Sequence, residues 1–282
     1  MFATLLIVFR EVIEAGLVVG IVLAATRGLR YRHLWVGGGV LAGLLGACII
    51  AVFAREIGET MQGMGQEIFN ATILLLAVLM LAWHNIWMSR HGRVIAAEMK
   101  DLGAAVASGK RSMLALAMVI GVAVLREGAE VVLFLYGVVA SDQGSKAEML
   151  LGGTVGLVLG GVLSAMMYLS LVRIPLRYLF SITSGLICLL AAGMAAQAVA
   201  FLQQAGVITV FDKIVWDSSA IIPEKTIVGK ILQALVGYVE QPSEMQIMVY
   251  VFTLVAIWGL MRLFAVPHSK PQANYRVHQI AE

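Results

Sequence analysis

The stretch MFATLLIVFREVIEAGLVVGIVLAA, residues 1–25, decides the fold. It is long and apolar enough to be a membrane-spanning helix, yet the pattern Arg-Glu-x-x-Glu interrupts it at 10–14. The stretch MLALAMVIGVAVLREGAEVVLFLYGVVA, residues 113–140, carries the same pattern at 126–130. Because a charge near the bilayer centre costs at least about 2.5–3.5 kcal/mol, the two motifs predict a functional site within a membrane protein.

On an ideal helix the three charged residues of each motif share one face, since positions i, i+1 and i+4 span about 100°. Two facing motifs would place four carboxylates beside two guanidinium groups, with a net charge of −2. Such a set suits a multivalent cation that prefers oxygen ligands. Buried ion pairs that only fix the helix register are the weaker interpretation, because each motif has one acid left over. The candidate metal ligands are Glu11, Glu14, Glu127 and Glu130, with Arg10 and Arg126 as charge partners.

The composition supports a polytopic membrane protein. Of the 282 residues, 60% are hydrophobic and only 13% are charged, which excludes an ordinary soluble domain. We therefore treat 1–282 as a single membrane transport domain. The basic residues lie in short segments between apolar runs, so nothing indicates binding to nucleic acid.

The apolar runs predict an all-α fold of seven transmembrane helices, at 2–25, 34–53, 68–88, 113–140, 149–172, 179–202 and 245–264. Lys and Arg are in excess in the connections after the first, third and fifth spans, and the connection after the third is the most basic loop. The positive-inside rule places these loops in the cytoplasm. The N-terminus is then predicted outside and the C-terminus inside.

The two motifs indicate an internal repeat, because Arg10 and Arg126 are offset by 116 residues. When the same offset is applied, the second predicted span falls within the fifth, and the third predicted span nearly coincides with the sixth. Because each repeat has three spans, an odd number, the two copies have opposite orientations in the membrane. Inverted repeats of this kind are typical of transporters with a site near the midplane. The predicted divisions are repeat 1 at about 1–111, repeat 2 at about 112–204, an outer segment at about 205–244, and a seventh span with a cytoplasmic tail at about 245–282.

With one Arg-Glu-x-x-Glu motif in the first span and one in the fourth, the chain resembles the oxidase-dependent iron permease family in its bacterial seven-span form. The resemblance extends to Trp83 and Trp87 at the end of the third span, to 191–196 in the sixth, and to Trp216-Asp217 and 237–243 in the outer segment. It implies that the four motif glutamates are iron ligands and that the two motif arginines are their charge partners.

The same resemblance implies a permease in the bacterial inner membrane, not an enzyme, with no permanently bound cofactor. Iron would be the substrate, moved into the cytoplasm as Fe(III) that is formed by oxidation of Fe(II) on the outer face. A periplasmic oxidase, peroxidase or cupredoxin-like iron-handling protein would be the partner, besides membrane lipid.

Three positions depart from the family pattern. Asn70 stands where the start of the third span often has a second acid, Gln204 stands where the end of the sixth span often has one, and His84 stands where apolar residues are usual. We interpret His84 as an interfacial histidine near the inner end of the third span, with a metal ligand or a proton relay as the alternatives. These departures concern accessory sites rather than the central motifs.

Acidic residues at the predicted outer mouth form a possible accessory site, because acids at a mouth concentrate cations. They are Glu56, Glu59 and Glu67, although a solvated loop acid is an equal alternative for Glu67. Two other functions stay open: transport of another multivalent metal, and an intramembrane metal-dependent enzyme. The enzyme is disfavoured because the chain has no His-Glu-x-x-His motif.

Overall fold

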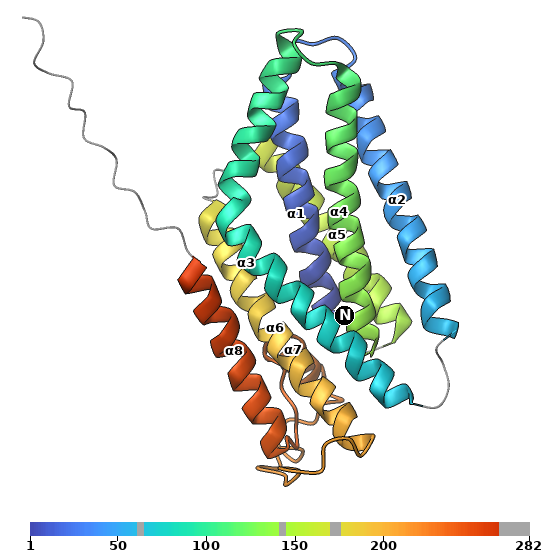
Figure 1. Cartoon of the computed structure of the whole chain (residues 1–282), viewed down its shortest axis with the longest axis vertical. Coiled ribbons are helices and arrows are strands. Elements are labelled where there is room, and N and C mark those ends of the chain that lie inside the picture. The colour runs from blue at the N-terminus through green and yellow to red at the C-terminus, as the bar shows by residue number, and fades with distance from the viewer. Residues whose placement is uncertain (61–64, 141–144, 170–175, 265–282) are drawn as a thin grey trace, which may run out of the picture.

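The computed structural model of the chain describes residues 1–60, 65–140, 145–169 and 176–264. Within these ranges the architecture is a bundle of helices, as predicted, and Figure 1 shows α3 crossing the front of it. The helices are α1 (Phe2–Ala25), α2 (Arg32–Thr60), α3 (Gln66–Ala107), α4 (Met113–Ala140), α5 (Lys146–Tyr168), α6 (Leu176–Gln204), α7 (Ile227–Val236) and α8 (Glu244–Phe264).

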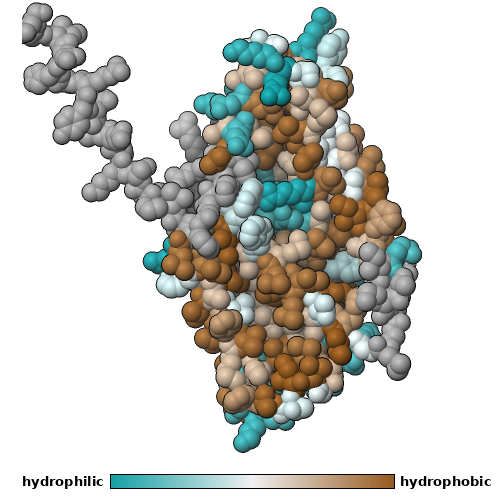
Figure 2. Space-filling view, in the orientation of Figure 1, coloured by the Kyte–Doolittle hydropathy of each residue, from teal (hydrophilic) through white to brown (hydrophobic). Residues whose placement is uncertain are grey.

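Five of these helices, α2, α3, α5, α6 and α8, each contain a stretch of 20–24 residues that is apolar enough to cross a membrane. The helices α1 and α4 differ because each carries the three charged residues of its motif near its middle. Large apolar side chains such as Leu79, Val122 and Leu150 are exposed. Figure 2 shows a mostly hydrophobic surface with a hydrophilic patch about midway along it. The chain is therefore a multi-pass membrane protein.

Helix α3 corrects the prediction of a basic loop after the third span. It does not end near 88 but continues to Ala107, so that Arg90 and Lys100 lie on the helix. This stretch has no proline and many residues with high helix propensity, which explains why it stays helical. The chain turns only after Ala107, where Gly109 adopts a φ of 77° that favours glycine.

Helices that are distant in the sequence pack against each other in pairs. Helix α1 packs along α5, α2 along α4, and α3 along α6, while α8 lies against α6. Figure 1 shows α2 and α4 side by side at one edge of the bundle. The motif helices α1 and α4 also contact each other and both contact α3. Three helices therefore surround the position of the charged motifs.

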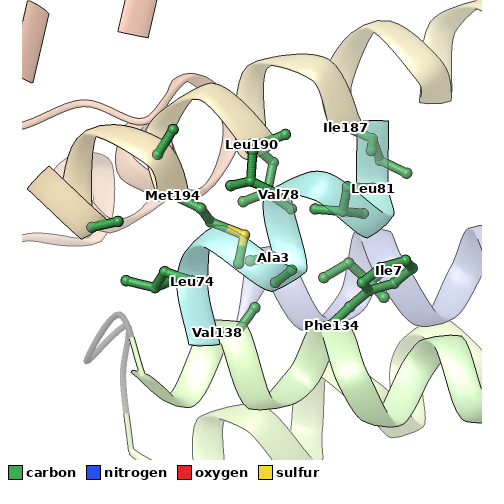
Figure 3. Packing of buried hydrophobic residues seen from close by; sticks show 14 of the residues in the cluster. Ala3, Ile7, Leu74, Val78, Leu81, Phe134, Val138, Ile187, Leu190 and Met194 are labelled. Atoms are coloured by element: carbon green, nitrogen blue, oxygen red, sulfur yellow. The ribbon is translucent and has the colours of Figure 1, made fainter. Parts of the chain in front are cut away.

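Two clusters of buried apolar side chains lie on either side of the charged motifs. Along α1, Ile7 belongs to the first cluster and Val22 to the second, so 10–14 lies between them. Along α4, Val124 and Phe134 bracket 126–130 in the same way. Figure 3 shows the first cluster, to which α1, α3, α4 and α6 contribute Ala3, Ile7, Leu74, Val78, Leu81, Phe134, Val138, Ile187, Leu190 and Met194.

The segment between α6 and α8 contains the short helix α7, as the helical spacing of its apolar residues suggests. Thr226 caps this helix, because its hydroxyl accepts a hydrogen bond from the backbone N–H of Gly229. Gly237 ends it with a φ of 70°. An isolated antiparallel bridge joins Ile214 to Ser243 and closes the segment at the start of α8.

Candidate metal site

The motif on α1 forms a fully buried charged group. The Arg10 side chain is 1% exposed, and its Nε lies 2.9 Å from Glu14 Oε1, one helical turn away. Its Nη1 lies 3.4 Å from Glu11 Oε1. Because the i, i+1 and i+4 positions share a face, a single guanidinium neutralises part of both carboxylates.

The motif on α4 has the same spacing but a different environment. Arg126 Nε lies 3.0 Å from Glu130 Oε1, and the Arg126 guanidinium stacks 4.2 Å from the centroid of the Trp87 ring on α3. Unlike Arg10, the Arg126 side chain is 38% exposed. The site is therefore more open on the α4 side than on the α1 side.

His84 joins the two motifs, and its position shows that the interpretation as an interfacial histidine was wrong. The side chain is 3% exposed and projects from α3 into the acidic cluster. Its Nε2 lies 3.3 Å from Glu14 Oε2, and its Nδ1 contacts Glu130 Oε2. A hydrogen bond from Asn85 Nδ2 to the Ser184 carbonyl, at 3.0 Å, ties this turn of α3 to α6.

Four residues from three helices form the tightest group of potential metal ligands. Glu11, His84, Glu127 and Glu130 each offer one ligand atom, and these atoms all lie within 4.8 Å of one another. An ion with metal–ligand bonds of about 2.0–2.2 Å separates opposite ligands by about 4 Å, so small side-chain movements would suffice. Glu14 reaches the group through His84. The structure thus brings the two motifs together, while their role as iron ligands stays a prediction.

Several oxygen atoms of the cluster are buried without a donor. Within the described part of the chain, neither Glu11 Oε2 nor Glu127 Oε2 accepts a hydrogen bond from a nitrogen or hydroxyl group. Burying such groups unpaired is costly. Four carboxylates face two arginines, so the net charge of −2 and the free oxygen atoms both favour a bound cation.

Of the predicted outer-mouth acids, Glu56 and Glu67 are not part of this cluster. Glu67 is exposed in the first turn of α3, and Glu56 is exposed near the end of α2, which continues past the predicted end at 53. The side chain of Glu59 lies outside the described residues. Their role as an accessory site therefore stays a prediction. A separate cavity of about 490 Å³ opens near the first residues of α1 and α5, where Lys230 Nζ lies 2.8 Å from Glu148 Oε1.

His84 could have been found from the sequence. An ionisable residue inside an apolar span is a candidate functional residue by default, and His84-Asn85 is such a polar pair within the third predicted span. Its place near the inner end of that span suggested a membrane interface instead. Of the two nearby tryptophans, Trp83 is 73% exposed, whereas Trp87 is half-buried against Arg126.

A buried acidic cluster inside a multi-pass helical bundle is typical of a membrane protein that moves cations. Residues 1–268 match the Iron permease FTR1 family, so the chain belongs to this family of iron permeases. It is therefore a membrane transporter for iron and not an enzyme.

Curated relatives are similar along nearly their whole length. The ferrous iron permease EfeU of Escherichia coli O6:H1 is 31% identical over 260 residues, which cover 90% of this chain and 93% of the relative. The ferrous iron permease EfeU of Yersinia pestis is 31% identical over 274 residues, which cover 95% of each chain. No solved structure matches the chain.

Proposed function

We propose that this permease imports iron across the bacterial inner membrane through the acidic cluster between α1, α3 and α4. The observation that carries the proposal is the meeting of Glu11, Glu127 and Glu130 in one group inside the bundle, in which some buried carboxylate oxygen atoms have no hydrogen-bond partner within the described residues. The apolar clusters on both sides keep this group away from either end of the bundle. A cation can therefore bind there, between the two sides of the membrane, during transport.

The bundle has seven membrane spans, of which α1 and α4 are the two that carry a charged Arg-Glu-x-x-Glu motif near the middle. Their 24 and 28 residues are long enough to cross the hydrocarbon layer. The connections 26–31 and 108–112 lie at one end of the bundle in Figure 1, and the segment between α6 and α8 lies at the other. This arrangement agrees with cytoplasmic basic loops, an outer segment at about 205–244, an outer N-terminus and a cytoplasmic C-terminus.

The two halves of the bundle are inverted repeats. In the predicted repeat, α4 is the equivalent of α1, and α5 is the equivalent of α2. The observed pairs agree with this, because α1 packs along α5 and α4 packs along α2. A side chain at Gly39 would collide with the Ala117 carbonyl, and one at Gly152 would collide with the Met1 carbonyl. Ala117 and Met1 are 116 residues apart, which is the offset of the motifs. Gly39 and Gly152 themselves are 113 residues apart, within three residues of that offset, so glycines at similar places in the two halves permit similar close approaches of helices.

Iron passes the site as Fe(III) that is formed by oxidation of Fe(II) on the outer face. Hard carboxylate oxygens favour this ion. The relatives are named as permeases for ferrous iron, so Fe(II) would be the form that reaches the outer face before oxidation. A periplasmic oxidase, peroxidase or cupredoxin-like protein supplies that step. An inside-negative potential favours import by about 2.3 kcal/mol per charge for each 100 mV.

The test is radioactive iron uptake by cells that express variants at equal membrane levels, with iron offered as Fe(II) or Fe(III). Glu11→Gln and Glu127→Gln remove one charge each from the cluster and should abolish uptake. The matched control is Glu98→Gln, because Glu98 is an exposed acid on the distal part of α3. Normal uptake by both cluster variants would overturn the proposed site.

A further inference from the structure

The chain places the His84 imidazole among carboxylates, at a position for which the sequence favoured an interfacial role over that of a metal ligand. We propose that His84 is a direct ligand of the transported ion through Nδ1, and that Glu14 is a positioning residue that orients the ring through Nε2. This proposal rests on the proposed function of the acidic cluster. It makes the site a mixed one, with one nitrogen ligand beside the carboxylate oxygens of Glu11, Glu127 and Glu130.

The contacts of the ring distinguish its two nitrogen atoms. Nδ1 contacts the carboxylate of Glu130, which belongs to the group whose ligand atoms lie within 4.8 Å of one another. Nε2 lies 3.3 Å from Glu14 Oε2, on the side of the fully buried α1 motif. A metal-bound histidine usually donates its other N–H to a carboxylate, which fixes the tautomer and the ring orientation. In the structure the His84 Nε2 and the Glu14 carboxylate lie next to each other in this order, at 3.3 Å, so a small movement of either side chain would complete such a contact.

Burial and fixation support a ligand rather than a surface group. The His84 side chain is 3% exposed, and the adjacent Asn85 is 1% exposed and donates to the Ser184 carbonyl of α6. The ring is thereby carried by a turn of α3 that is held between the motif helices and α6. A ligand on a rigid element is held in place at little further cost in conformational entropy when an ion binds.

An imidazole changes which ions the site accepts. Oxygen ligands alone favour hard ions, whereas imidazole suits borderline ions such as Fe(II), Co(II) and Zn(II). Among divalent ions, Co(II) binds such ligands more tightly than Fe(II). We therefore expect Co(II) to compete with iron for this permease more effectively than it would at a site made only of carboxylates.

The direct test is pulsed electron paramagnetic resonance of Cu(II) bound to the purified full chain in lipid nanodiscs. In a background variant the other four histidines, His33, His91, His268 and His278, are replaced by glutamine. In this background His84 carries the only imidazole, so the expected result is modulation from its remote nitrogen. Adding His84→Gln to the background should abolish that modulation. Bound Cu(II) without this modulation in the background variant overturns the proposal, and that result does not depend on whether the His84 variant folds.

The transport test separates this proposal from the proposed function. In cells, His84→Gln should raise the Co(II) concentration that halves iron uptake by about tenfold or more, whereas His33→Gln, at an exposed position, should not change it. If Glu11→Gln abolishes iron uptake while His84→Gln changes neither uptake nor Co(II) inhibition, His84 is no ligand and the proposed function stands. If neither variant changes uptake, both proposals fail.

Discussion

The two motif arginines are equivalent in the sequence, but we expect them to contribute very differently to stability. The Arg10 side chain is 1% exposed and contacts two buried carboxylates, at 2.9 Å and 3.4 Å. Arg10→Gln leaves these carboxylates without their cation, and breaking a buried ion pair in this way costs about 3–5 kcal/mol. The same substitution at Arg126 removes one ion pair at 3.0 Å from a side chain that is 38% exposed.

The expected loss at Arg126 is smaller because solvent already screens this group. A partly exposed ion pair contributes about 0.2–1 kcal/mol, and the stacking of the guanidinium on Trp87, at 4.2 Å, adds about 0.5–1 kcal/mol. Arg126→Gln should therefore cost about 1–2 kcal/mol in total. The difference between the two arginine variants is then about 1–4 kcal/mol.

The free energy of unfolding can be measured by titrating the purified protein in detergent micelles with a denaturing detergent and following helix content by circular dichroism. Glu98→Gln serves as the control, because replacing this exposed acid should not change the free energy of unfolding. The double variant Arg10→Gln/Glu14→Gln should recover part of the loss, because it removes one carboxylate together with its cation. An Arg126 variant that is destabilised as much as the Arg10 variant, or a double variant with no recovery, would refute the reasoning.

Three further predictions concern packing and the outer segment. Gly39→Leu should destabilise the bundle by about 1–3 kcal/mol through overpacking, whereas Gly37→Leu, which meets no neighbouring atom, should be nearly neutral in the same unfolding assay. Phe134→Ala empties a fully buried position in the cluster of Figure 3 and should cost about 3–5 kcal/mol, again measured by detergent unfolding. Hydrogen bonds from Ser219 lower the pKa of Asp217. Asp217→Asn should therefore speed proteolysis of the outer segment at pH 7. This difference should shrink as the pH falls below the normal value of about 3.9 and should vanish below the lowered pKa of the folded protein.

Much of the fold followed from local patterns in the chain. The predicted span at 113–140 has the bounds of α4, and the one at 245–264 begins one residue after α8. Length and apolarity decide these helices because a membrane helix satisfies its own backbone hydrogen bonds. The prediction failed where apolarity ends but the helix does not, since α3 continues through polar residues with high helix propensity as far as Ala107.

The candidate site was predictable only in part. A charge inside an apolar run is visible in the sequence, so the four glutamates and two arginines were identified, and their spacing placed each motif on one helical face. The position of Glu14 was not visible. In the structure it lies between Arg10 and His84 rather than beside Glu127 and Glu130 in the tightest group.

The sequence by itself determined that this protein crosses the membrane several times and carries two charged motifs inside apolar helices, because hydropathy and helical periodicity are properties of neighbouring residues. The tertiary structure decided that α3 lies between the motif helices, that His84 faces their carboxylates, and that Arg10 is enclosed while Arg126 is partly exposed. These features depend on which helices pack together and on how they are rotated about their axes. Contacts between residues that are far apart in the chain set both, so no local pattern contains them.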